Sequence, residues 1–98
     1  MFIKIHKSYR DVIAICDSEL IGKKFEEDIF QLDVKENFYK GEEINEEKAI
    51  KIFQRMSKED VTFNIVGNES VNAAIKAGII EREEIKKIKG IPFALVLL

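Results

Sequence analysis

The segment from Thr62 to Gly78, TFNIVGNESVNAAIKAG, constrains the fold of this chain more than any other segment. An apolar run ends at Gly67, three polar residues follow, and a short helical pattern closes on Gly78. In α/β proteins, a strand, a glycine turn and a helix in this order present backbone N–H groups where anions are favoured. The segment predicts an α/β unit with a candidate anion or small-ligand site at Gly67, Asn68 and Ser70.

Length and composition favour a single domain covering residues 1–98. A chain of this size can bury one core, but a deep substrate cavity would compete with that core, so a binding or accessory module is favoured over an enzyme. There is no run of about 18 apolar residues, and the alternating start is unlike a signal peptide. We therefore expect a cytoplasmic protein with no membrane partner. The one cysteine, Cys16, excludes an internal disulfide.

Two alternating segments at the N-terminus predict an antiparallel hairpin. These segments are Phe2 to His6 and Asp11 to Cys16, with four residues between them. Burial of four isoleucines on one face would enforce a single register. The expected register pairs Ile3 with Ile15 and Ile5 with Ile13.

The middle of the chain is less regular. Residues 23–28 are polar and predict a loop or turn, whereas residues 29–34 alternate and predict a third strand. Residues 37–41 predict a turn that carries two aromatic side chains. Asp17 or Ser18 is expected to cap a short turn just after the hairpin.

The second half predicts alternating helices and strands. Asn45 is a favourable N-cap for a helix over residues 46–57, and residues 61–66 predict a fourth strand. A helix beginning at Asn68 or Glu69 should end at Gly78. Residues 81–88 predict a helical turn, and the apolar residues 91–98 predict a strand covered on both faces.

These elements predict a mixed α/β (α+β) fold. We expect a mixed sheet of about five strands that begins with an antiparallel hairpin, together with two to three helices. A right-handed strand-helix-strand unit should close the chain and place its two strands in parallel.

The charge distribution permits, but does not establish, a basic surface. The net charge is −2, but residues 26–47 alone carry −7, so the remainder carries +5. Tyr9 and Arg10 on an exposed turn could stack on unpaired bases, as in single-stranded RNA recognition. The candidate RNA-binding residues are Lys4, Lys7, Tyr9, Arg10, Lys51 and Arg55; a charge run of this kind is more often only a solvated face.

The sequence offers little support for metal or nucleophilic chemistry. One His and one Cys cannot supply the roughly four ligands of a structural zinc site. Glu42–Glu43 and Glu46–Glu47 lack EF-hand spacing and suit a solvated helix start. The expected register places Cys16 and His6 roughly 13 Å apart, too far for a nucleophile and its base. We expect no catalytic residue, metal or cofactor, and the roles of Cys16 and His6 stay open.

Several strings resemble a known family over nearly the whole chain. They are DSELIGK at residues 17–23, Phe38–Tyr39 with Gly41, NIVGNESVNAAIKAGII at residues 64–80, and KGIP at residues 89–92. They resemble the archaeal family called domain of unknown function family 424, whose members are small single-domain proteins. The resemblance implies no established activity and a loose association with RNA binding or translation.

The leading hypothesis is therefore a non-enzymatic RNA-binding or translation-associated accessory protein, with RNA or the ribosome as partner. The alternative is a small-ligand or anion-binding module, or a minor enzyme, at Gly67 to Ser70. A third reading is a structural interaction protein that docks through its C-terminal strand. The sequence does not specify the RNA target, the ligand or the oligomeric state.

Overall fold

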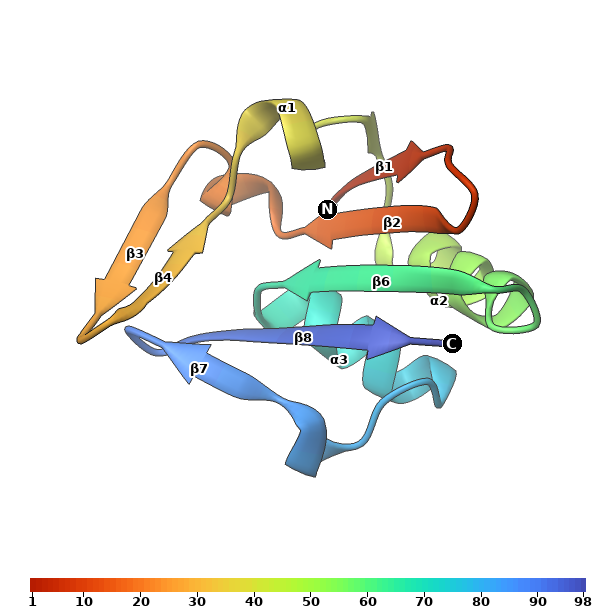
Figure 1. Ribbon diagram of the computed structural model, residues 1–98. Coiled ribbons are helices and arrows are strands. Elements are labelled where there is room, and N and C mark those ends of the chain that lie inside the picture. Colours follow the sequence, from red (N-terminus) through yellow and green to blue (C-terminus); the bar gives the residue numbers. More distant parts are fainter.

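The computed structural model describes all 98 residues as one domain with three helices and eight strands (Figure 1). The helices are α1 (Glu36–Tyr39), α2 (Glu46–Met56) and α3 (Asn68–Ala77). The strands are β1 (Phe2–His6), β2 (Asp11–Cys16), β3 (Lys24–Glu27), β4 (Phe30–Asp33), β5 (Glu42–Glu43), β6 (Val61–Val66), β7 (Lys86–Ile88) and β8 (Ile91–Leu97). Two 3-10 turns, Ser18–Leu20 and Arg82–Glu84, complete the elements.

Six strands form a mixed sheet in the order β5-β1-β2-β6-β8-β7, and β3 and β4 form a separate two-stranded ribbon. The predicted hairpin register is confirmed, because Ile3 pairs with Ile15 and Ile5 pairs with Ile13. Among the paired strands of the main sheet, only β2 and β6 run parallel to each other. The mixed α+β class is therefore confirmed, with one more strand in the main sheet than expected.

The prediction that the closing strand-helix-strand unit pairs two parallel strands is wrong. β6 pairs antiparallel with β8 because the chain leaving α3 first forms β7. This strand lies at the end of residues 81–88, for which the sequence predicts a helical turn. The β7–β8 hairpin then inserts β8 between β6 and β7. β6 and β7 point the same way, so the crossover exists but its two strands are not neighbours.

One face of the sheet, here called the back face, is covered by α2 and α3 (Figure 1). Asn45 caps α2 as predicted, with its Oδ1 accepting from the Lys48 backbone N–H at 2.9 Å. The larger core lies here, where Phe53 of α2 packs edge-to-face against Phe63 of β6 with ring centroids 5.2 Å apart. Burial of this aromatic pair fixes α2 on the sheet.

The opposite face, here called the front face, is covered only in part, by α1 and the β3–β4 ribbon (Figure 1). A smaller core lies under these elements and includes Cys16, Tyr39 and Val66. Beyond them the front of the sheet is open, and Leu95 and Leu97 are 60% and 69% exposed. The prediction that the last strand is covered on both faces is therefore wrong, because α1 is too short to reach it.

Three local predictions need correction. Residues 24–27 form β3 and not a loop, and the predicted third strand shortens to β4, which pairs with β3 outside the main sheet. Residues 36–39 form a short helix, α1, which overlaps the turn predicted over residues 37–41. No helix is long and apolar enough to cross a membrane.

Candidate functional site

The N-terminus of α3, predicted as an anion site, already holds the carboxylate of Asp17. Asp17 Oδ1 accepts from the backbone N–H and the hydroxyl of Ser70, both at 2.8 Å, and Oδ2 accepts from the Glu69 N–H at 3.0 Å. Asp17 and Ser70 are both buried. A carboxylate in this position satisfies free N–H groups and interacts favourably with the helix dipole.

Asp17 reaches α3 from the end of β2, which the β2–β6 pairing brings beside the start of the helix. The prediction that Asp17 caps the nearby turn is wrong in its detail, because its side chain makes no hydrogen bond to that turn. Pairing across about fifty residues is invisible to local sequence patterns. A ligand at Gly67, Asn68 and Ser70 stays a prediction, but it would have to displace a resident carboxylate.

Gly67 makes this arrangement possible. A Cβ atom at Gly67 would lie 2.2 Å from Asp17 Cγ, and its backbone has φ +106°, a region that favours glycine. The Gly67 N–H donates to the Pro92 carbonyl at 2.8 Å. The glycine therefore serves close packing between the strands and α3.

Glu19 and Glu69 lie near Asp17, with one oxygen of each carboxylate within 4.8 Å of the others. Glu19 and Glu69 are exposed, whereas both oxygens of Asp17 are engaged by α3. The hydrogen bonds of the Asp17 carboxylate thus identify this residue as the cap of α3.

The β1–β2 turn presents an unusually exposed aromatic residue. Tyr9 is fully exposed, and its exposed neighbour Arg10 makes no ion pair. Lys7, in contrast, is bound to Asp11 at 3.1 Å, and this contact together with the Ser8 N–H lowers the pKa of Asp11 below its usual value. Of the predicted tip residues, Tyr9 and Arg10 are free for a partner.

Lys4 and His6 attach α1 to the sheet. Lys4 Nζ donates to the Asn37 carbonyl and His6 Nε2 donates to the Phe38 carbonyl, each at 2.8 Å. The His6 ring also stacks on Phe38, with ring centroids 4.5 Å apart. Both side chains thus satisfy carbonyls at the end of a short helix, which gives His6 a structural role that the sequence left open.

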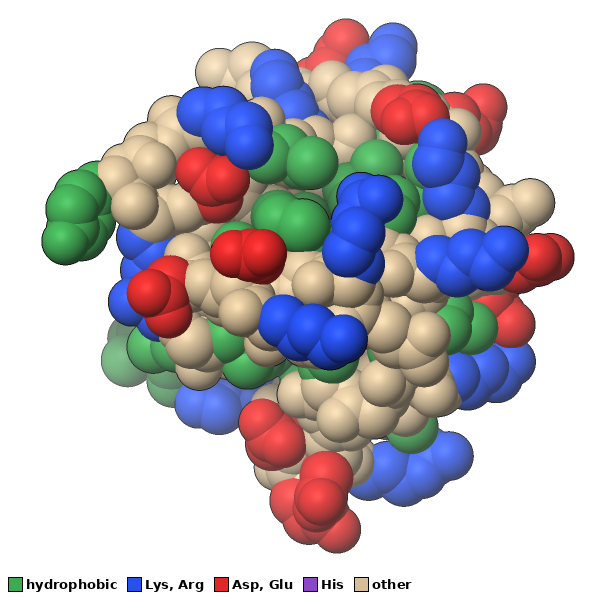
Figure 2. All heavy atoms as spheres, turned by 90° about the vertical axis from the view of Figure 1, so that its right-hand side faces the viewer, with side chains coloured by type: hydrophobic (Ala, Val, Ile, Leu, Met, Phe, Trp, Pro, Cys, Tyr) green, Lys and Arg blue, Asp and Glu red, His purple; other side chains and the backbone are tan.

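The predicted basic residues of α2 lie on the other side of the sheet. Lys51 is paired with Glu47 at 3.3 Å, and its neighbour Lys48 with Glu42 at 2.6 Å, while Arg55 makes no ion pair. Figure 2 shows the side of the molecule that lies to the right in Figure 1, and acidic and basic side chains are intermixed on it. The structure therefore does not bring Lys4 together with Lys51 and Arg55 in one basic surface.

The uncovered part of the front face carries basic, polar and apolar side chains. In one row His6, Val12, Thr62 and Leu97 lie side by side, and in the next row Lys4, Asn64 and Leu95 flank the buried Ala14. We call the seven partly or fully exposed side chains of these rows the open sheet face: Lys4, His6, Val12, Thr62, Asn64, Leu95 and Leu97. It carries no acidic side chain.

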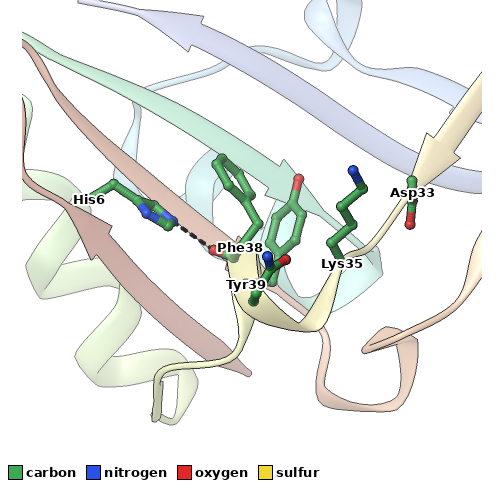
Figure 3. A pocket seen from close by; sticks show the side chains of 6 residues that line it. His6, Asp33, Lys35, Phe38 and Tyr39 are labelled. Carbon is green, nitrogen blue, oxygen red and sulfur yellow. Dashed lines mark hydrogen bonds between the residues drawn. The ribbon is translucent and has the colours of Figure 1, made fainter.

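A cavity of about 440 Å³ adjoins the open sheet face at His6. Its lining comes from β1, the end of β4 and α1, and consists of His6, Asp33, Lys35, Asn37, Phe38 and Tyr39. Figure 3 shows the rings of His6, Phe38 and Tyr39 in sequence at one end, and Lys35 and Asp33 toward the other. Neither Lys35 nor Asp33 is in an ion pair, so both charges are available to a ligand.

The sequence does not reveal this cavity, although the adjacent aromatics Phe38 and Tyr39 are evident in it. The missing information is the contact between His6 and α1, which joins residues about thirty positions apart. A polar turn that carries two adjacent aromatics is a weak signal, since such residues often only seal a core. Here Tyr39 does enter the smaller core, while Phe38 stays half-buried.

Cys16 and Tyr39 are buried and hard to ionise. Burial, followed by the charge of Asp17, raises the pKa of the Cys16 thiol from 9.0 to about 12. Burial, followed by the nearby Cys16, raises the pKa of Tyr39 from 10.0 to about 12. Cys16 lies at the opposite end of the hairpin from His6, so the pair cannot act as nucleophile and base.

These shifts predict a loss of stability at high pH. Above pH 9 the unfolded chain ionises Cys16 while the folded chain does not, so the free energy of unfolding should fall by about 1.4 kcal/mol per pH unit for each such group. The fall should begin near pH 9, and Tyr39 should add to it above pH 10. Urea unfolding between pH 8 and 10.5 measures the free energy of unfolding. In the Cys16→Val variant, the part of the decrease that is due to the thiol should be absent.

Together, the fold and the cavity define a small single-domain α+β protein with a mixed sheet that is fully covered on one face only. The family model described as "Protein of unknown function (DUF424)" matches residues 6–98, and the chain belongs to this family. The resemblance inferred from the sequence motifs is thereby confirmed.

One solved structure has the same fold. It is described as the crystal structure of an uncharacterized conserved protein from Methanopyrus kandleri, and it is 25% identical to this chain with a TM-score of 0.83. The similarity covers 98% of this chain and 90% of that chain. No curated protein matches.

Proposed function

We propose that this protein binds single-stranded RNA across the open sheet face and the adjoining β1–β2 turn, without catalysing a reaction. The observation that carries the proposal is the open sheet face itself, which has amide, hydroxyl, imidazole and apolar side chains and no carboxylate. Exposed sheet surfaces bind unpaired bases where aromatic side chains stack on the bases and polar groups meet their edges. His6 on the face and Tyr9 at its border are the rings that this surface offers.

The β1–β2 turn extends this surface at its edge. The fully exposed Tyr9 offers a ring for base stacking, and Arg10 offers a charge that is in no ion pair. The α2 residues Lys51 and Arg55 are excluded from the proposed surface, since they lie behind the sheet among acidic side chains. A role in translation is a further part of the proposal and rests on the family resemblance alone. A cytoplasmic location is also proposed, from the sequence features described above.

Removing the turn side chains should weaken RNA binding. The probe is a fluorescein-labelled single-stranded RNA of mixed sequence and about ten nucleotides, titrated by fluorescence anisotropy at low salt. Tyr9→Ala combined with Arg10→Ala is expected to raise the Kd at least about tenfold, because one stacked base and one phosphate contact are lost. The melting temperature should be nearly unchanged, as both side chains are exposed.

The matched control is Lys51→Ala combined with Arg55→Ala, which removes two cations of α2. Its Kd should stay within about twofold of the parent value, since these residues lie behind the sheet. Equal losses in the two double variants would indicate nonspecific attraction and contradict the proposed surface. No binding by the parent protein would overturn the function.

A further inference from the structure

We propose that the cavity beside α1 is a ribonucleotide-binding pocket that holds one nucleotide by its base, its ribose and its phosphate. The inference rests on the proposed function and deepens it, because it assigns to the cavity a role in distinguishing RNA from DNA. The cavity has a volume of about 440 Å³ and is open to solvent, so it would enclose a nucleotide only in part.

The aromatic end of the cavity suits a base. The half-buried rings of His6 and Phe38 stack on each other with an interplanar angle of 18°, so a base would lie against an outer face of this pair. Tyr39 is buried and meets Phe38 edge-on with centroids 5.0 Å apart. The hydrogen bond from His6 to the Phe38 carbonyl fixes the orientation of the stacked pair. The site is therefore preorganised, which lowers the entropy cost of ordering it around a base.

The charged end suits a ribose phosphate. Lys35 is exposed and free of ion pairs, so its ammonium group can bind a phosphate. Asp33 lies two residues before Lys35 in the chain and is half-buried. Its carboxylate can accept hydrogen bonds but cannot donate them. Carboxylates bind ribose hydroxyls in other nucleotide sites, and the 2′-OH is the group that distinguishes RNA from DNA.

The two charged residues lie together on one side of the rings, with Lys35 nearer to the rings than Asp33 in the view of Figure 3. Figure 3 shows the rings at one end and Lys35 and Asp33 toward the other. A base against the rings places its ribose and phosphate near the two charged residues. His6 belongs both to the cavity and to the open sheet face, so a strand on that face can deliver one nucleotide into the pocket.

The test compares RNA with DNA. Binding of an RNA decamer and the DNA decamer of the same sequence (uracil retained in both) is measured for the parent protein, Asp33→Ala and Lys35→Ala. The parent should prefer RNA by about tenfold, the effect expected of one hydrogen bond to a charged group. Asp33→Ala should remove most of this preference, whereas Lys35→Ala should weaken RNA and DNA by the same factor.

Two variants control for charge alone. Glu26→Ala removes an exposed acid from the neighbouring strand β3, and Lys40→Ala removes a cation just beyond α1; neither residue lines the cavity. Both should leave the preference for RNA unchanged. Far-UV circular dichroism and melting temperature show whether Asp33→Ala and Lys35→Ala keep the fold.

The outcomes separate the pocket from the proposed function. Equal affinity of the parent for RNA and DNA, or a preference that survives Asp33→Ala, would overturn the pocket while leaving nucleic-acid binding intact. Failure of the parent to bind either decamer would overturn the proposed function. In that case, NMR shifts at Phe38 and Tyr39 on adding AMP, but not dAMP, would support the pocket as a site for a free ribonucleotide, and their absence would overturn it.

Discussion

Asp17→Ala is expected to lower the free energy of unfolding by about 3 to 5 kcal/mol, because three hydrogen bonds to a buried carboxylate are lost together. The backbone N–H and the hydroxyl of Ser70 would remain buried without their acceptor, and the partly buried Glu69 N–H would lose its partner as well. In a domain of this size the melting temperature should fall by at least about 12 °C. Thermal and urea unfolding followed by circular dichroism measure both quantities.

Two neighbouring variants show whether the loss comes from the carboxylate and its bonds. Ser70→Ala removes one of the three donors and should cost about 1 to 2 kcal/mol. Glu19→Ala removes a nearby exposed carboxylate and should change stability by no more than about 0.5 kcal/mol. An Asp17→Ala protein as stable as Glu19→Ala would refute the assignment of Asp17 as the cap of α3.

Gly67→Ala is expected to destabilise the protein by about 3 to 5 kcal/mol or to prevent folding. The new methyl group would lie 2.2 Å from Asp17 Cγ, and alanine rarely adopts φ +106°. The same unfolding experiments apply, with the fraction of folded protein at 20 °C as the readout if no transition is seen.

Gly78→Ala is the matched control, because Gly78 also has a positive φ, +80°, but no heavy atom within 4 Å of the position of a Cβ. It should cost about 1 to 2 kcal/mol, the penalty of the left-handed conformation alone. The added cost of Gly67→Ala should shrink when Asp17 is already alanine, since the clashing carboxylate is then absent. Equal costs at the two glycines would disprove the close packing between Gly67 and Asp17.

Local patterns were sufficient for elements with strong periodicity and clear ends. Ile3, Ile13 and Ile15 specify one register, because a slip by one residue would move them out of the core. The expected burial of Ile5 beside them is wrong, since its side chain is 42% exposed. Asn45 and Gly78 mark helix ends through chemistry contained within a few residues. The strand β7 was missed because residues 86–88 are too few to show alternation.

Contacts between distant segments were not predictable in the same way. The cap of α3 by Asp17 and the attachment of α1 by His6 depend on which strands become neighbours, and the sequence alone gives no measure of that. The open sheet face also depends on tertiary structure, since the apolar run at residues 91–98 is typical of a fully covered strand. Leu95 and Leu97 stay exposed because α1 contacts mainly β1 and β2, and the β3–β4 ribbon contacts β7.

The most direct test of RNA binding on the front face is an NMR titration of ¹⁵N-labelled protein with the unlabelled RNA decamer. The proposed function predicts amide shifts that cluster at residues 4–10, 62–64 and 95–97, with further shifts at residues 33–39 if the pocket is filled. The amide resonances of α2 should not shift. An unchanged spectrum at saturating RNA, or shifts confined to α2, would contradict the proposed function.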